Sequence, residues 1–428
     1  MSTLAITGGR TVSGVHAVSG NKNAALPMIA ASLLTAEPVT LTNVPEISDV
    51  DAMLEAAVGF GARVERDRAA GTVAIHTPKL KSSRIAPALA AKMRTSVLFA
   101  GPLLARAGRA ALPPPGGDAI GHRRLDTHFA GFRALGAKAI LGRETLRFRG
   151  ELKGAKMLLD EASVTATENI LMASVLAKGR TEIYNAASEP HIVDLANMLS
   201  AMGAKIEGAG TNLIRVEGVE SLHGAEARVG CDYIEAGSYI VAAAITGGEL
   251  TLTGIDPAPF AVIEGAFRRF GVTWQISHTE RTLRYIPKKH RRMRYDLGDA
   301  IPSVSDGIWP AFPSDLMSVL IVLATQTRGT CLFFEKMFES RLYFVDKLIQ
   351  MGAKIVQCDP HRVVVTGPSQ LYGSRVSSPD IRAGIALVIA ALAAKGVSRI
   401  LNAEIVDRGY VAVERELSAL GAGIVREG

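Results

Sequence analysis

Charged and polar side chains gather where the apolar segments of this chain begin. Three of these starts carry a cation, Lys22, Arg94 or Arg382, and three carry an acidic residue, Asp232, Asp315 or Asp380. A cation opposes the positive end of a helix dipole, so these bases are unfavourable there unless an anion offsets them. Helix N-termini themselves favour phosphates and carboxylates. The pattern therefore predicts a binding site for a small molecule with two anionic groups.

Helix capping is the alternative explanation for several of the same positions. Serine, threonine and aspartate accept hydrogen bonds from backbone N–H groups at a helix start. Such residues stand at Ser314, Asp315, Ser378 and Thr165, and Thr165 with Glu168 has the spacing of a capping box. Capping does not explain why a lysine or an arginine stands at a helix start. For the serine, threonine and aspartate positions, helix capping and anion binding both stay open.

A loop rich in proline and glycine is the second feature with chemical potential. It runs over residues 113–126 and begins with three prolines followed by two glycines. Proline stiffens the entrance of such a loop, and glycine permits unusual backbone angles. A hinged lid and an ordinary long connection both fit this composition. Asp118 and Arg123 near the tip favour the lid.

Six copies of one unit must position these side chains. An apolar residue, a glycine and a small residue recur about every 70 residues and account for the whole chain. Each copy follows an amphipathic pattern, so each glycine is expected to end a helix in the left-handed conformation. The six glycines are Gly61, Gly136, Gly203, Gly271, Gly352 and Gly421.

Each unit also contains an earlier and more apolar helix. Near-continuous hydrophobicity indicates burial on most sides. The expected ranges are 23–35, 95–107, 165–178, 236–246, 315–327 and 380–395, of which four are expected to end at Gly179, Gly247, Gly329 and Gly396. Six units divide into two α/β domains of three, with buried helices surrounded by sheets and outer helices.

Composition limits the class of protein. The 428 residues are 48% hydrophobic and 21% charged, which excludes a disordered chain. Three cysteines without close pairing predict a reducing, cytoplasmic location and no cysteine-based zinc site, and no other metal constellation occurs. No apolar stretch reaches the ~20 residues of a membrane span. We therefore expect no metal and no membrane segment.

The net charge of +7 is densest at residues 288–294. Nucleic-acid binding is one interpretation of this cluster, but it lacks interleaved aromatic residues and a binding motif. A solvated loop between strands is favoured. We therefore expect no nucleic-acid partner.

Seven segments together resemble the enolpyruvyl transferases, and the resemblance covers almost the entire chain. They lie at residues 19–27, 115–121, 163–170, 189–194, 312–315, 338–341 and 407–410. The family fold is an inside-out α/β barrel of two domains, each with three repeats, whose cleft closes around both substrates. The resemblance implies a first domain over residues 21–231, carrying the loop, and a second over 1–20 plus 232–428, carrying the general base.

The resemblance is closest to the branch of the family that uses a sugar nucleotide. It implies transfer of the enolpyruvyl group of phosphoenolpyruvate to the 3-hydroxyl of UDP-N-acetylglucosamine, with release of phosphate and without a cofactor. This is the first committed step of peptidoglycan synthesis. It implies a role in cell-wall formation, cell shape and division. The sequence does not indicate an oligomeric state.

Matching motifs imply roles for particular residues. Lys22, Arg123 and Arg408 would hold the phosphate and carboxylate of phosphoenolpyruvate, and Asp315 would be the general base. Asp380 and Arg382 match polar positions near the reacting centre. Residues matching the sugar-nucleotide site are Asn23, Arg94, Arg124, Leu125, Asp126, Thr127, Ser163, Val164, Thr165, Met337 and Arg341.

Asp118 stands where most relatives have a cysteine. The resemblance implies that Asp118 is the general acid, and that fosfomycin, which alkylates the cysteine, does not inactivate this protein. Other departures lie at Glu161, Thr165, Tyr233 and 291–309, on the acceptor side. They leave open a different acceptor, such as another sugar nucleotide, a nucleoside or shikimate 3-phosphate. A non-catalytic relative that binds sugar nucleotides is the alternative from another class.

Overall fold

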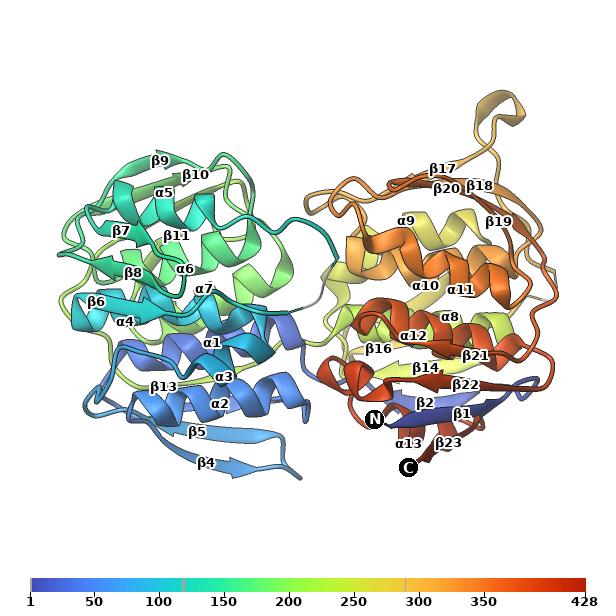
Figure 1. The fold of residues 1–428 in the computed structure, drawn as a ribbon, viewed down its shortest axis with the longest axis horizontal. Coiled ribbons are helices and arrows are strands. Elements are labelled where there is room, and N and C mark those ends of the chain that lie inside the picture. The colour runs from blue at the N-terminus through green and yellow to red at the C-terminus, as the bar shows by residue number, and fades with distance from the viewer. Residues whose placement is uncertain (1, 118–119, 289) are drawn as a thin grey trace. The chain divides into compact units, whose positions relative to one another are not determined.

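The computed structural model describes residues 2–117, 120–288 and 290–428, which form two compact units. Unit 1 holds the described residues of 2–19, 120–122 and 231–428, and unit 2 holds those of 20–117 and 123–230. Both units are mixed α/β structures, as Figure 1 shows. The α/β class is therefore confirmed.

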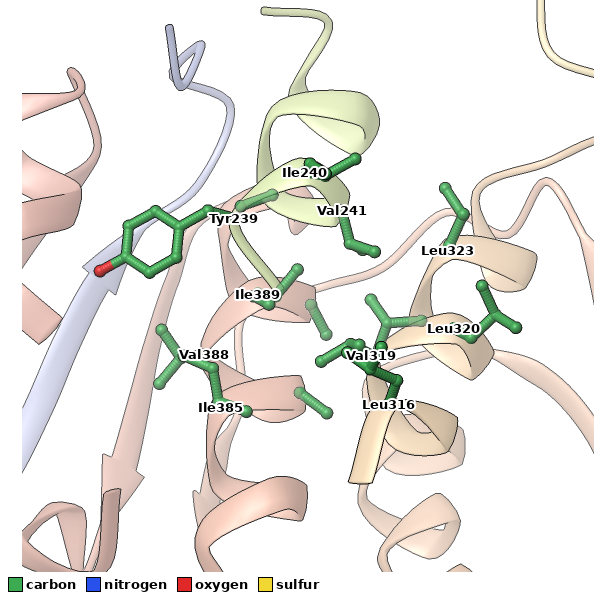
Figure 2. Close-up of a cluster of buried hydrophobic side chains, with 14 of the residues drawn as sticks. Tyr239, Ile240, Val241, Leu316, Val319, Leu320, Leu323, Ile385, Val388 and Ile389 are labelled. Carbon is green, nitrogen blue, oxygen red and sulfur yellow. The ribbon is translucent and has the colours of Figure 1, made fainter. Parts of the chain in front are cut away.

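Three helices that are buried along almost their full length form the centre of unit 1. They are α8 (Tyr233–Thr246), α10 (Ser314–Thr325) and α12 (Ile381–Ala393). Figure 2 shows side chains of all three meeting in one apolar cluster that includes Val241, Val319 and Ile389. Contact on every side explains why these segments are apolar all round rather than amphipathic.

Three four-stranded sheets belong to unit 1. In spatial order they are β21 (Arg375–Ser377), β22 (Val397–Leu401), β1 (Thr3–Thr7) and β23 (Gly423–Glu427); β15 (Trp274–Ser277), β16 (Thr282–Tyr285), β14 (Leu250–Thr253) and β2 (Gly14–Ala17); and β17 (Ser303–Ser305), β18 (Gly329–Phe334), β20 (Arg362–Gly367) and β19 (Lys354–Asp359). Strand β1 pairs antiparallel with both β22 and β23. The first strand of the chain thus completes a sheet whose other strands lie at its C-terminal end, and β2 completes the sheet of β14, β15 and β16.

Unit 2 has the same kinds of element. Its inner helices are α1 (Lys22–Ala31), α4 (Ala100–Ala107) and α6 (Val164–Ser174). Its sheets, in spatial order, are β11 (Lys205–Glu207), β12 (Leu213–Glu217), β10 (Arg180–Tyr184) and β9 (Lys156–Leu158); β13 (Ala225–Arg228), β3 (Val39–Thr42), β5 (Thr72–His76) and β4 (Arg63–Asp67); and β6 (Arg109–Leu112), β8 (Leu146–Arg149) and β7 (Lys138–Leu141).

The six sheets formed by the described residues share one pairing pattern. In five of them a parallel pair of strands is continued by antiparallel strands. In the three-stranded sheet an isolated parallel bridge between Arg84 and Ala111 takes the place of that parallel pair. The recurrence of one pattern supports the interpretation of the chain as repeated units.

The outer helices end as the repeated glycines predict. These helices are α2 (Ser48–Phe60), α5 (Asp126–Ala134), α7 (Pro190–Ala201), α9 (Pro257–Arg269), α11 (Val345–Gln350) and α13 (Val413–Ala419). All six glycines have a positive φ, between 75° and 110°. A left-handed residue that lets the backbone turn away from a helix end is usually glycine. The helix-ending role of the glycines is confirmed.

The second inner helix is not continuous, contrary to the range expected for it. A 3-10 segment, η2 (Arg94–Phe99), precedes α4. Pro102 has no N–H for the helical ladder, and the N–H of Gly101 donates instead to Oδ1 of Asn169 at 2.8 Å. A Cβ at Gly101 would collide with the backbone of Asn169. Close packing against α6 therefore sets the break.

Three of the four expected glycine ends of inner helices are wrong. Only α8 is capped by its glycine, Gly247, whereas α6, α10 and α12 end earlier. In α6 the hydroxyl of Ser174 donates to the carbonyl of Ile170, and in α10 the hydroxyl of Thr325 donates to that of Val322, each at 2.7 Å. Side-chain donors at the last carbonyls compete with continued helix.

Five short helical segments complete the secondary structure. They are η1 (Ser32–Leu34), α3 (Pro87–Lys92), η3 (Leu297–Asp299), η4 (Arg341–Phe344) and η5 (Ala403–Arg408). No described helix is long and apolar enough to cross a membrane.

The basic cluster lies in the connection between β16 and β17, as expected for a loop between strands. Arg291 donates to the carbonyl oxygens of Ala244 and Gln326, which lie at the C-terminal ends of α8 and α10. A cation is favourable at a helix C-terminus. Part of this charge therefore serves the fold of unit 1.

Candidate active site

Asp315 lies between two guanidinium groups in unit 1. Its Oδ1 accepts a hydrogen bond from Nη2 of Arg341, and its Oδ2 accepts one from Nη2 of Arg382, each at 2.9 Å. The arginine side chains are at most 6% exposed, whereas 26% of the Asp315 side chain is exposed. The carboxylate is thus the accessible member of an otherwise buried charge cluster.

The charge state of Asp315 follows from these two neighbours. Burial opposes its ionisation, but the charges of Arg382 and Arg341 and their hydrogen bonds outweigh burial and hold the pKa of Asp315 well below its usual range. Asp315 is therefore a carboxylate at neutral pH.

Arg382 is held by a buried network at the start of α12. Its Nη1 donates to the hydroxyl of Tyr410 at 3.4 Å, and that hydroxyl is 2.9 Å from Oγ of Ser238. Asp380 caps the helix by accepting from the backbone N–H groups of Arg382 and Ala383. The sequence pattern predicted that a bound anion offsets this cation, but in the structure the carboxylate of Asp315 already does so.

The capping explanation holds at different residues from those expected. The side-chain caps of the inner helices are Asn21, Ser163, Asp232 and Asp380. Within the described part of the chain, α10 has no side-chain cap, because its N-cap residue is Pro313, and Ser314 and Asp315 in its first turn bond to other side chains. The capping box at Thr165 is wrong, since Ser163 caps α6 and a carboxylate oxygen of Glu168 is buried without a hydrogen bond in the described structure.

The expected cap at Ser378 is also wrong. Its hydroxyl donates to the carbonyl oxygen of Asp380, and Asp380 itself caps α12. Pro379, read as the first residue of the helix, had placed the helix start two residues too early.

Lys22 begins α1 in unit 2 and pairs with a carboxylate. Its Nζ lies 2.6 Å from Oδ2 of Asp49, and both residues are buried. Asp49 stands in the first turn of α2, where an acid is favoured by the helix dipole. The backbone N–H of Asn23 donates to Oδ1 of Asn21 at 2.7 Å, so the start of α1 is fixed.

Arg94 binds the end of the Pro113–Asp126 loop from within unit 2. Its Nη2 donates to the carbonyl oxygens of Arg123 and Arg124. Burial, and next the charge of Arg123, lower the pKa of Arg94 to about 10, while Glu161 opposes this shift. Arg94 and Arg123 are thus brought together, and Glu161 at its unusual position supplies a compensating charge.

The residues after Arg123 form a short polar network. Arg124 Nε donates to Oδ2 of Asp126 at 3.1 Å, and Nη2 donates to Asp160 at 3.4 Å. Thr127 Oγ1 donates to the other oxygen of Asp160 at 2.7 Å. Leu125 occupies the N-cap position of α5. The matched residues 124–127 therefore lie together, and Asp160 joins them.

Ser163, Val164 and Thr165 form the start of α6, and Thr165 contacts a buried histidine. His128 Nε2 lies 3.1 Å from Oγ1 of Thr165, and its Nδ1 lies 3.1 Å from Nδ2 of Asn169. Since the amide nitrogen donates to Nδ1, the proton of the neutral ring is assigned to Nε2. Burial, and next the charge of Arg94, lower the pKa of His128 to about 3.

Acid should destabilise the protein through His128. A depressed folded-state pKa contributes stability that is present above the unfolded pKa of about 6.5 and is lost as the pH falls towards about 3. Between pH 7 and pH 5 this amounts to about 2 kcal/mol. The change in the free energy of unfolding from pH 7 to pH 5, measured in urea, should be about 2 kcal/mol less favourable for the wild type than for His128→Gln. The exposed His223→Gln should follow the wild type, and equal changes in all three proteins would contradict the expectation.

The remaining matched residues of unit 1 lie in two short segments. Arg408 ends η5, and Met337 lies between β18 and η4 with 38% of its surface exposed. The loop residues 120–122 belong to the same unit: the N–H of His122 donates to Oε1 of Glu339 at 2.8 Å. Gly121, with φ 138°, lies so close to Glu339 that a Cβ would collide with the carboxylate. Asp118 lies outside the described residues.

Five residues near these groups were not found from the sequence. They are Asp49, His128, Asp160, Asp306 and Glu335. Asp49 pairs with Lys22, and Asp160 accepts a hydrogen bond from Arg124. The need of these two cations for an acidic partner was the signal in the sequence that could have suggested both acids. Among the described residues no group of three or more His, Cys, Asp or Glu side chains could hold a metal ion.

Comparison with known proteins identifies the family. The model of the family described as EPSP synthase (3-phosphoshikimate 1-carboxyvinyltransferase) matches residues 6–417. The chain is 51% identical to the UDP-N-acetylglucosamine 1-carboxyvinyltransferase of Treponema pallidum (strain Nichols), over 100% of both chains. It is 49% identical to the protein of the same name from Treponema denticola, over 99% of both chains.

A solved structure shows the same fold. The enolpyruvyl transferase NikO from Streptomyces tendae superimposes with a TM-score of 0.88 at 23% identity, covering 99% of this chain and 98% of that one. At this identity the likeness concerns the fold alone. The family model and the full-length relatives show that the chain belongs to the enolpyruvyl transferase family, among the UDP-N-acetylglucosamine 1-carboxyvinyltransferases.

Proposed function

We propose that this protein transfers the enolpyruvyl group of phosphoenolpyruvate to the 3-hydroxyl of UDP-N-acetylglucosamine and releases phosphate. The observation that carries the proposal is the accessible carboxylate of Asp315 between two buried arginines. Such a group can accept a hydroxyl proton while neighbouring cations bind an anionic donor. The names of the full-length relatives support the same pair of substrates.

The donor is assigned to three cations. Lys22, Arg123 and Arg408 bind the phosphate and carboxylate of phosphoenolpyruvate, since a substrate with several negative charges needs several charge-assisted hydrogen bonds. Lys22 forms an ion pair with Asp49 in the structure, so binding of the donor loosens or shares that pair.

The acceptor is assigned to polar groups at helix starts and to the segment after β18. These residues are Asn23, Arg94, Arg124, Leu125, Asp126, Thr127, Ser163, Val164, Thr165, Met337 and Arg341, with Asp380 and Arg382 nearer the reacting atoms. The contact of Thr165 with His128 gives a structural reason for a side chain at that position.

The proposed reaction needs one acid and one base. An acid protonates the methylene carbon of phosphoenolpyruvate, and the neighbouring carbon becomes oxocarbenium-like. The sugar oxygen attacks that carbon while Asp315 accepts its proton. The conjugate base of the acid then takes a proton back from the new methyl group, phosphate leaves with the C–O bond electrons, and the enolpyruvyl double bond is restored. Asp315 becomes a stronger base when Arg341 or Arg382 turns towards a substrate anion.

Asp118 is the proposed acid, and it gives the protein a distinctive drug response. Fosfomycin reacts with a cysteine thiolate at this loop position, and a carboxylate does not take part in that alkylation. Incubation with fosfomycin should leave wild-type activity unchanged over time, whereas Asp118→Cys should lose activity progressively and gain the mass of the adduct. Asp118→Asn should lower turnover about 10²- to 10⁴-fold. Time-dependent labelling of the wild type would contradict the expectation.

A phosphate-release assay with purified protein and phosphoenolpyruvate tests the main proposal. UDP-N-acetylglucosamine should stimulate release, and another sugar nucleotide, a nucleoside and shikimate 3-phosphate should not. Stimulation by one of the other acceptors would replace the acceptor but keep the reaction class. Tight binding of UDP-N-acetylglucosamine in calorimetry without any turnover would instead support a non-catalytic relative.

The wider setting is part of the proposal. The activity belongs to the first committed step of peptidoglycan synthesis in the cytoplasm and so serves cell-wall growth, shape and division. The fold is proposed as an inside-out α/β barrel with three repeats in each of the domains 21–231 and 1–20 plus 232–428. The three sheets and three inner helices of each compact unit support it.

A further inference from the structure

Two buried carboxyl groups lie side by side at the ends of neighbouring parallel strands. In the pairing of β17 with β18, Ser305 is opposite Phe334. The next residues are Asp306 and Glu335, which are 1% and 0% exposed. Oδ1 of Asp306 accepts from the backbone N–H of Lys336, and its Oδ2 is buried without a hydrogen-bond partner in the described part of the chain.

Glu335 connects the two segments that carry Asp315 and Arg341. Its two oxygens lie 2.9 Å from Oγ of Ser314, the residue before Asp315 at the start of α10. Its Oε1 also accepts from the backbone N–H of Phe338 at 3.2 Å, in the turn that leads to Arg341. One carboxyl group therefore fixes both sides of the ion pair between Asp315 and Arg341.

The surroundings of Glu335 favour a bound proton. Burial, and next the hydrogen bond and the negative charge of Asp306, raise the pKa of Glu335 to about 9, while Arg341 and the Ser314 hydroxyl oppose the shift. Lys336 and His361 are also ionisable and lie nearby, and Nδ1 of His361 lies 2.7 Å from the backbone oxygen of Glu335, not from its carboxyl group. Two adjacent buried carboxyl groups do not both ionise at neutral pH, and the pair titrates as one system.

We propose that Glu335 and Asp306 share one proton and that this acid pair positions Asp315 and Arg341 for proton transfer. The shared proton gives Oδ2 of Asp306 its missing partner, and it leaves Glu335 able to accept from Ser314 and Phe338. Glu335 and Asp306 are positioning residues, since they act through Ser314 and the turn after β18. The positioning role rests on the proposed function, in which Asp315 is the base, whereas the shared proton does not.

Unfolding at different pH values tests the shared proton without any substrate. A raised folded-state pKa contributes stability below the unfolded pKa of about 4.3, and this contribution is lost as the pH rises to the folded pKa near 9. We therefore compare the folding equilibrium constants of the wild type and of Glu335→Gln. Between pH 5 and pH 9 the ratio of the wild-type constant to the variant constant should fall tenfold for each pH unit. The exposed Glu280→Gln should follow the wild type. Equal slopes for the wild type and Glu335→Gln would overturn the shared proton.

Turnover with phosphoenolpyruvate and UDP-N-acetylglucosamine tests the positioning. At pH 8, Glu335→Gln should keep kcat within about threefold of the wild type because its amide reproduces the protonated acid, whereas Glu335→Ala should lose at least about tenfold. From pH 8 to pH 10 the ratio of Glu335→Gln to wild-type kcat should rise at least about fivefold, as the wild type loses the shared proton. Equal activity of the Gln and Ala variants would overturn positioning.

Two further outcomes separate the parts of the proposal. If the wild type shows no turnover while the unfolding slopes differ, the proposed function fails, positioning falls with it, and the shared proton stands. If added Mg²⁺ raises the melting temperature of the wild type but not that of Glu335→Gln, a cation occupies the pair and the shared proton is overturned.

Discussion

Replacement of Asp315 by asparagine should lower turnover about 10²- to 10⁴-fold, the usual contribution of a general base. The amide cannot accept the proton of the sugar hydroxyl, although it fills the same volume. Affinity for UDP-N-acetylglucosamine, measured by calorimetry, should change far less than kcat, because the expected effect concerns the transition state.

The same substitution should also cost stability. The substitution leaves Arg341 and Arg382 buried without their shared carboxylate. Because hydrogen bonds to charged groups are lost, the free energy of unfolding should fall by about 1–3 kcal/mol. Denaturant unfolding therefore accompanies the kinetic assay. The exposed Asp346→Asn in α11 is the matched control and should change neither quantity. Full turnover of folded Asp315→Asn would remove this residue from the mechanism.

Replacement of Lys22 by glutamine should weaken use of phosphoenolpyruvate more than use of the acceptor. Glutamine can still donate to Asp49, so the contact between α1 and α2 is kept without the charge. Loss of one partner of a desolvated charge pair costs about 2–5 kcal/mol. This predicts a fall of about 30- to 4,000-fold in kcat/KM for phosphoenolpyruvate.

The control for Lys22 is an exposed lysine of the same unit. Lys205→Gln in β11 removes the same charge from the protein and should leave kcat/KM unchanged. If the Lys22 and Lys205 variants behave alike, Lys22 serves only its ion pair with Asp49 and is not a ligand of the donor.

The regular parts of the fold could be predicted because they depend on local patterns. Glycines such as Gly61 and Gly421 mark helix ends wherever they occur, and an apolar run such as that of α12 indicates burial without reference to a partner. Helix interruptions were missed for the opposite reason. The break before α4 depends on Asn169, which is 68 residues from Gly101 in sequence.

The site was predictable only in part, because its charges are balanced over long sequence distances. Lys22 and Asp315 stand at helix starts and could be found there, but Asp49 and Glu335 are recognisable only as their neighbours in space. The sequence alone does not distinguish a serine that caps a helix from a serine that donates to a buried acid. Ser163 is the first kind and Ser314 the second.

The pairing of β1 with β22 and β23 has a consequence for synthesis of the chain in the cell. All of unit 2 is made before the last third of unit 1, so unit 2 can fold first. At about 5–20 residues per second, residues 3–7 wait about 20–80 s for their first partner strand. During that time the apolar residues Leu4, Ala5 and Ile6 lack their cover, and the backbone groups of their strand are unpaired, which is the kind of segment that associates wrongly with other chains.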